Sequence, residues 1–245
     1  MKITFKCTEC VGNGLSNVDF QDVEINSEGI YVITCDEGHK TLKFTSEPLF
    51  DVLFDFAAYS LLDGYRREAV VNFVASLERF YEYCIQIMSF EAGIEFNEFN
   101  TTWKLVKRSE RQIGAFYMLY LNTFKEAPGS LENVKVGKFN AVNFRNEVVH
   151  NGFIPSMEDT LRYGELVYKH ILDLYYKITN KCYEGRMLEL TKKQKEYYAL
   201  NKVNDINIIE VSSQISFLNL NRYKDYKHPS FEERLEEFER IRCIK

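Results

Sequence analysis

The sequence predicts a mainly α-helical protein with a small N-terminal β module and a mixed C-terminal extension. Only 4 of the 245 residues are proline, so long helices can form without interruption. Apolar residues recur with helical spacing between residues 47 and 180. Residues 1–46 instead contain short strand-like segments separated by glycine-containing turns. We therefore expect three parts, 1–46, 47–180 and 181–245.

The N-terminal module is expected to form four short strands. The strand-like segments are 2–6, 18–25, 30–34 and 41–45. A module this small buries little apolar surface by itself, so it needs an additional staple such as a disulfide or a metal ion.

Two pairs of metal-ligand residues supply that staple. Cys7 and Cys10 form a C-x2-C pair, and Cys35 and His39 form a C-x3-H pair after 24 intervening residues. Three thiolates and one imidazole are the donor set of a tetrahedral structural zinc site, in which no position stays open for catalysis. The alternative is that the three cysteines occur by chance beside a surface histidine. Two correctly spaced pairs in one module favour the metal site. The segment resembles a zinc ribbon.

Charge and cysteine usage limit the function classes. The net charge of -5 argues against a protein that coats long nucleic acids nonspecifically. Residues 1–46 carry seven acidic and four basic residues, which favours a structural or protein-docking role for the module. The sequence shows neither a signal-peptide pattern nor an apolar run of about 20 residues, so we expect a cytoplasmic protein. The six cysteines are then expected to be thiols or metal ligands.

Residues 47–180 are expected to form a bundle of five helices. The first starts at Pro48 and ends at Gly64, and the others cover 66–88, 104–125, 139–151 and a segment that starts at Pro155-Ser156. Gly152 is well placed to end the fourth helix. His170 lies on the apolar side of the last helix, so we expect a hydrogen-bonded core residue there.

The C-terminal extension has weaker patterns. Residues 188–201 are compatible with a polar helix, and 206–218 show strand-like alternation. Residues 230–242 are expected to form an exposed helix, with Ser230 and Glu233 as a capping box.

The stretch from Arg145 to His150 carries residue types that suit cleavage of a phosphodiester. Arg145 offers a rigid fork of donors for phosphate, and His150 can move protons near neutral pH. On an α-helix, Asn146 and His150 share a face one turn apart, and Arg145 lies about 100° to one side of Asn146. The alternative is a solvated arginine, a surface asparagine and a histidine at the end of a helix.

The stretch and its surroundings resemble the HEPN family (higher eukaryotes and prokaryotes nucleotide-binding domains). The signature of that family is an arginine, four to six residues, and then a histidine, often with asparagine directly after the arginine. Here it corresponds to Arg145, Asn146 and His150, late in an apolar helical bundle. The resemblance covers roughly residues 47–180, including the start of the second helix at Gly64–Val70.

The resemblance implies a metal-independent endoribonuclease that acts as a homodimer, with two motifs around one composite cleft. His150 would transfer protons during attack by the RNA 2′-hydroxyl group, and Arg145 would stabilise charge on the phosphate. Asn146 would orient His150 or the phosphate. The products would carry 2′,3′-cyclic phosphate ends. The resemblance also implies a prokaryotic toxin, anti-phage or stress-response system, with an antitoxin or regulatory protein as a partner.

A basic cluster beside Trp103 could guide RNA toward such a cleft, with the indole as a stacking surface. The cluster comprises Lys104, Lys107, Arg108 and Arg111. A solvated helix start is the alternative. Glu78, on the polar side of the second helix, is expected to be solvated and paired with Arg79 or Arg66.

Two noncatalytic interpretations stay open. A HEPN scaffold that binds a nucleotide or a partner protein would use the motif for packing or dimerisation. A zinc-ribbon adaptor would use its helical body only for assembly.

Overall fold

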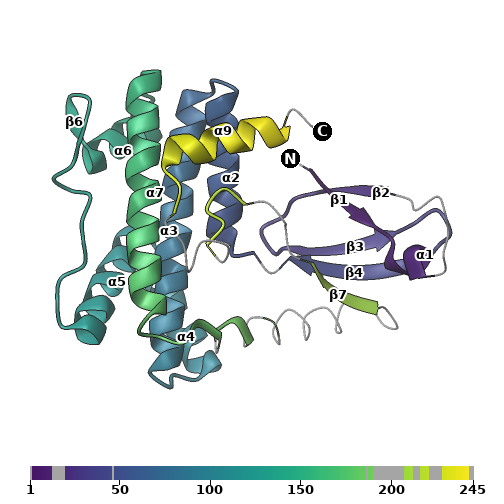
Figure 1. Ribbon diagram of the computed structural model, residues 1–245. Coiled ribbons are helices and arrows are strands. Elements are labelled where there is room, and N and C mark those ends of the chain that lie inside the picture. The colour runs from purple at the N-terminus through teal and green to yellow at the C-terminus, as the bar shows by residue number, and fades with distance from the viewer. Residues whose placement is uncertain are drawn as a thin grey trace. The chain divides into compact units, whose positions relative to one another are not determined.

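The computed structural model describes residues 2–12, 20–45, 47–185, 187–189, 192, 207–211, 216–220 and 228–242. The chain divides into two compact units (Figure 1). The first comprises Met1–Glu47 and Leu188–Gln214, and the second comprises Pro48–Met187 and Ile215–Lys245. The first unit is mostly β-sheet and the second is helical, so the predicted mainly α class is confirmed.

Two small sheets form the first unit. β1 (Lys2–Lys6) and β2 (Phe20–Glu24) make an antiparallel pair. β4 (Lys40–Thr45) is the central strand of the second sheet, antiparallel to β3 (Ile30–Thr34) and parallel to β7 (Asn207–Val211). The four predicted N-terminal strands are therefore confirmed with small shifts in their bounds. β7 lies inside the segment predicted to be strand-like.

The side chains of β3 and β4 alternate between two faces, as the period of a strand requires. One face contributes to an apolar cluster of Phe5, Val23, Tyr31 and Ile33. The other face carries a cluster of Ile30, Leu42 and Phe44. Lys43 is paired with Tyr31 across the two strands, so it lies on the first face, and it is only 3% exposed. A charged residue is thus buried where the strand pattern favours an apolar one.

α3 (Arg66–Glu91) is the central helix of the second unit. α2 (Leu49–Leu62), α5 (Ser109–Phe124), α6 (Ala141–His150) and α7 (Met157–Thr179) all pack against it (Figure 1). Buried phenylalanine rings along α2 and α3 form much of this core; they include Phe50, Phe54, Phe73 and Phe80. Among the described residues, no helix is both long and apolar enough to cross a membrane.

The predicted third helix, 104–125, is wrong at its start. The chain instead forms α4 (Phe96–Val106) and then α5, with a break at Lys107 and Arg108. Phe99 of α4 packs against Phe90 at the end of α3, with ring centroids 5.1 Å apart. The chain therefore has to turn after α4 before α5 can run along α3, and Arg108 takes the extended conformation that makes this turn.

α6 is shorter than the predicted helix over 139–151 because a small hairpin precedes it. The hairpin consists of β5 (Lys135–Val136) and β6 (Phe139–Asn140). Asn140 then caps α6, since its side-chain oxygen accepts a hydrogen bond from the Asn143 backbone N–H at 2.8 Å.

The predicted glycine stop after α6 is confirmed. Gly152 has a φ of 71°, a backbone conformation that residues other than glycine rarely adopt. The turn lets the Phe153 backbone N–H donate to the Glu147 carbonyl oxygen at 3.0 Å. The C-terminal end of α6, where His150 lies, is therefore held in a defined conformation.

Residues of the predicted C-terminal extension, 181–245, take part in both units. β7 joins the first unit, whereas α9 (Phe231–Arg242) packs against α2 and α7 in the second. The capping box is confirmed: the Glu233 backbone N–H donates to Ser230 Oγ at 3.1 Å, and the Ser230 backbone N–H donates to Glu233 Oε2 at 2.7 Å. Most of the predicted polar helix, 188–201, lies outside the described residues.

Candidate functional site

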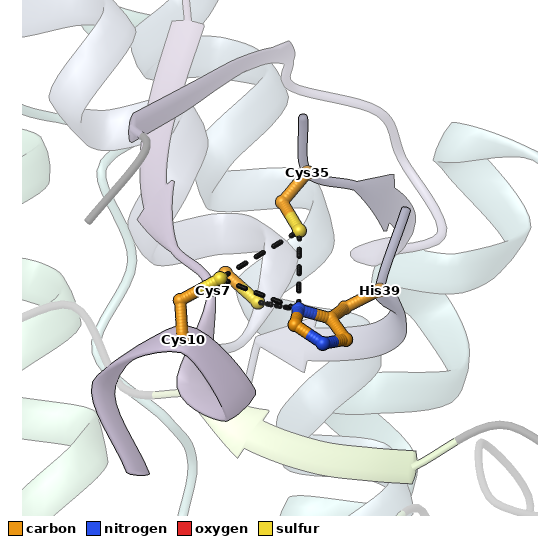
Figure 2. A group of neighbouring side chains, drawn as sticks. All are labelled: Cys7, Cys10, Cys35 and His39. Carbon is orange, nitrogen blue, oxygen red and sulfur yellow. Dashed lines mark hydrogen bonds between the residues drawn. The ribbon is translucent and has the colours of Figure 1, made fainter. Parts of the chain in front are cut away.

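The four predicted metal ligands come together in the first unit. Their ligand atoms all lie within 4.8 Å of one another. Cys7 directly precedes α1 (Thr8–Gly12) and Cys10 lies within it, while Cys35 and His39 flank the turn between β3 and β4. Figure 2 shows the sulfur atoms and the imidazole directed toward one another.

The distances within this cluster fit a tetrahedral ion. Cys10 Sγ and Cys35 Sγ are 3.8 Å apart. His39 Nδ1 lies 3.3, 3.4 and 3.9 Å from the sulfur atoms of Cys10, Cys35 and Cys7. Zinc bonds of about 2.3 Å to sulfur and 2.0 Å to nitrogen place tetrahedral sulfur pairs about 3.8 Å apart and sulfur–nitrogen pairs about 3.5 Å apart. The cluster can therefore hold a metal ion of this size.

The surroundings of the cluster orient its ligands. All three cysteines are buried. The second ring nitrogen of His39 lies 3.7 Å from Glu9 Oε2, an arrangement that fixes the orientation of metal-binding histidines. Gly38 has a φ of 80°, and its backbone N–H donates to the Cys35 carbonyl oxygen at 2.9 Å. This turn brings Cys35 and His39 to the same point.

Arg145 forms an ion pair with Glu78. Arg145 Nη2 lies 2.7 Å from Glu78 Oε1, and Arg145 Nη1 donates to Asn146 Oδ1 at 2.9 Å. The side chains of Arg145 and Glu78 are 24% and 25% exposed, so solvent reaches both. The sequence predicted Arg79 or Arg66 of the same helix as the partner of Glu78. The structure instead pairs Glu78 with Arg145, because α6 packs against α3, and Arg79 forms its ion pair with Glu82 at 2.5 Å.

Beneath the ion pair lies an aromatic core. Phe144, on the inner side of α6, is fully buried, and its ring centroid is 5.3 Å from that of Tyr163. Burial raises the pKa of Tyr163, and the charges of Arg145 and Glu78 shift it in opposite directions. The phenol is therefore close to both members of the ion pair. Sequence reasoning missed Tyr163 because it belongs to the apolar stripe of α7.

His150 lies in the last turn of α6 and is exposed. Asn146, one turn earlier, is half-buried on the same face. Arg145 and Asn146 are in direct contact. His150 belongs to the same helix, one turn after Asn146. The three predicted side chains thus lie along the outer side of α6.

The predicted basic cluster lies where α4 meets α5. Its four members, Lys104, Lys107, Arg108 and Arg111, are all exposed. The ring of Trp103 is nearly parallel to that of Phe99, with an interplanar angle of 12° and a centroid distance of 5.9 Å. Trp103 is therefore partly covered by the protein itself.

Glu82 connects the basic cluster to α3. Burial raises the pKa of Glu82, whereas the Arg79 charge, a hydrogen bond from Trp103 and the Lys107 charge lower it. Glu82 follows Glu78 by one helical turn, about 6 Å along the axis of α3. The ion pair of Arg145 and the basic cluster are thus attached to neighbouring turns of one helix.

His170 is a core residue, as predicted. It is 8% exposed, and its Nε2 lies 2.9 Å from the hydroxyl oxygen of Tyr81. Burial lowers the pKa of His170 from its ordinary value of 6.5 to about 4. The imidazole is therefore neutral in the folded protein at physiological pH.

We expect this histidine to make stability depend on pH between 6.5 and 4. In that window the unfolded chain binds a proton at His170 and the folded protein does not, so stability is lost as the pH falls. The shift from 6.5 to about 4 corresponds to roughly 3 kcal/mol. Urea unfolding should show that the wild type loses about this much more stability than His170→Gln on acidification. Curves that stay parallel would contradict the prediction.

Comparisons with protein-family models, with curated proteins and with solved structures find no match for this chain. The resemblance to the HEPN family stays a prediction from the residues of the motif. Two local arrangements of the chain carry functional chemistry, the cysteine–histidine cluster and the outer side of α6.

Proposed function

We propose that this protein is a HEPN-type endoribonuclease whose N-terminal module holds a structural zinc ion. The observation that carries the proposal is the outer side of α6, where Arg145 and Asn146 are in contact and His150 is exposed on the face of Asn146. A second protomer, implied by the resemblance, would bring an equivalent set of side chains to a shared cleft. The same resemblance suggests a role in a toxin, anti-phage or stress-response system.

In the proposed reaction, the 2′-oxygen of a ribose attacks the adjacent phosphorus and the bond to the 5′-oxygen breaks. A base removes the 2′-hydroxyl proton, and an acid donates a proton to the leaving 5′-oxygen. His150 suits either step, so two copies in a dimer could divide them. The products are a 2′,3′-cyclic phosphate and a 5′-hydroxyl group.

Arg145 would stabilise the charge that develops on the phosphate. Its guanidinium is already oriented by Glu78 and Asn146, and a preorganised donor stabilises a transition state without further rearrangement. Glu78 also offsets the positive charge locally. We therefore expect phosphate affinity to depend on additional cations, for which the basic cluster beside Trp103 is the candidate.

The Glu78 ion pair also favours one alternative, a noncatalytic HEPN scaffold that binds a nucleotide or a partner protein. An arginine paired with a carboxylate can serve to hold α6 against α3, in which case the motif is structural. If the motif is catalytic, replacing His150 should slow RNA cleavage. If the motif only packs helices, replacing His150 should have little effect, because its side chain is exposed.

The test measures cleavage of labelled RNA by the wild type, by Arg145→Ala and by His150→Ala. We expect each variant to cleave about 100-fold to 1,000-fold more slowly, because each loses a transition-state donor or a proton-transfer group. Asn143→Ala is the matched control, because Asn143 is also exposed on α6 and stands outside the motif. Mass spectrometry of the wild-type products should find 2′,3′-cyclic phosphate ends.

Undiminished cleavage by Arg145→Ala and His150→Ala would contradict the nuclease proposal. A wild-type protein that binds RNA or a partner but leaves every RNA intact would support the scaffold instead. Circular dichroism of each variant separates a catalytic defect from loss of the helical fold.

A further inference from the structure

A buried ammonium group lies beside the cysteine–histidine cluster. Lys43 is 3% exposed. It lies on the inner face of β4, opposite Tyr31 of β3. Its Nζ donates a hydrogen bond to the Lys6 carbonyl oxygen, which belongs to the peptide group that joins Lys6 to Cys7. The Nζ also lies 5.2 Å from the centroid of the Phe5 ring.

These contacts do not balance the charge of the lysine. A carbonyl oxygen and an aromatic ring each carry only partial negative charge, and a buried ion needs a full counter-charge nearby. Among the described residues, no carboxylate lies within ion-pair distance of Lys43. Burial lowers the pKa of Lys43, and the negative charge of a Cys7 thiolate raises it. The cluster is therefore a source of negative charge for Lys43, which is bonded to the carbonyl oxygen of the residue before Cys7.

The charge of a zinc-loaded cluster supplies what Lys43 lacks. Zinc contributes two positive charges, three thiolates contribute three negative charges, and a neutral imidazole contributes none, so the centre carries one negative charge. We propose that Lys43 is the buried counter-ion of this metal centre and strengthens its hold on zinc. The inference rests on the proposed zinc site and assigns a function to a residue outside the four ligands.

The test compares zinc binding by full-length wild type, Lys43→Met and Lys40→Met. Methionine keeps most of the length of the side chain, one heavy atom fewer, and removes its charge. We expect Lys43→Met to bind zinc about 10-fold to 100-fold more weakly in competition with a chromogenic chelator, as for other residues that support metal ligands. Lys40→Met removes an equal charge from an exposed position of the same strand, so its affinity should change by less than about threefold.

Two further measurements separate charge from packing. The cobalt(II) form of Lys43→Met should keep the absorption bands of a tetrahedral site with three sulfur ligands, because the four ligands are unchanged. Lys43→Arg restores a positive charge and should recover most of the affinity. If arginine is as weak as methionine, the lysine acts through packing and the counter-ion role is overturned. Should Lys43→Met fail to fold, Lys43→Gln provides the same comparison.

The outcomes also separate this inference from the zinc site on which it rests. If the wild-type protein binds no zinc in competition with the chelator, both the metal centre and the role of Lys43 are overturned. Wild-type protein that binds zinc tightly, with Lys43→Met equally tight, overturns the counter-ion alone. Weaker binding by Lys43→Met with arginine rescue supports both.

Discussion

Removal of zinc from the proposed site is expected to unfold the first unit while the helices of the second stay folded. The described core of the first unit consists of small apolar clusters, and units of this size depend on a staple. The ligands join the segment around α1 to the turn between β3 and β4, which are otherwise distant in sequence. Structural zinc contributes about 10–16 kcal/mol in zinc-finger peptides, far more than such clusters can replace.

Amide hydrogen exchange, read separately for β3 with β4 and for α3, measures this effect. After chelation, or in Cys10→Ser, protection in β3 and β4 should fall to that of an unfolded chain, while α3 keeps its protection. Cys84→Ala is the control, because Cys84 is a buried thiol of α3 outside the cluster. Strands that stay protected in protein verified to be free of zinc would contradict the prediction.

The ligand set could be predicted because each half of it is local. Cys7 with Cys10 and Cys35 with His39 are pairs within a few residues, and spacing alone indicates that each pair can share an ion. The roles of Glu9 and Lys43 depend instead on which strands pack together, which no spacing reveals. Thr41, Lys43 and Thr45 share one face of β4, and all three are buried. Their polar side chains are equally compatible with a face exposed to solvent, so the sequence pattern does not predict the burial of Lys43.

The same distinction separates the motif on α6 from its partner. Asn146 and His150 share a face because both belong to one helix, and periodicity predicts this. The contact between Arg145 and Glu78 joins residues 67 positions apart in the sequence. Periodicity indicated that Glu78 lies on a polar side of its helix, but the identity of the helix packed against that side depends on the whole bundle.

The last helix shows where composition misleads. Its many charged residues predicted an exposed helix, yet Phe231, Arg234 and Phe238 of α9 are buried. Arg234 is 1% exposed and reaches back to the preceding segment. Phe217 in that segment packs against the rings of Phe54, Tyr168, Phe231 and Phe238. The segment and α9 therefore belong to the core of the helical unit.

Arg234→Ala is accordingly expected to destabilise the second unit by about 3–5 kcal/mol, because two buried carbonyl oxygens lose a charged donor and a large buried side chain is removed. Arg234 Nε donates to the Phe217 carbonyl oxygen at 2.8 Å, and Nη2 donates to the Ser216 carbonyl oxygen at 2.5 Å. Nη1 pairs with Glu237. Alanine leaves these acceptors without their donor and opens a cavity beside the Phe217 ring. Urea unfolding followed by helical circular dichroism measures the change.

Arg240→Ala is the matched control, because Arg240 lies on the same helix, is 74% exposed and forms an ion pair with Glu236 at 3.5 Å. Its loss should change stability by less than about 0.5 kcal/mol. Arg234→Lys keeps the charge but cannot reach both carbonyl oxygens with one planar fork, so its stability should fall between those of wild type and alanine. If lysine matched the wild type, the charge alone would suffice. If Arg234→Ala cost no more than Arg240→Ala, the last helix would be the exposed appendage that its composition suggests.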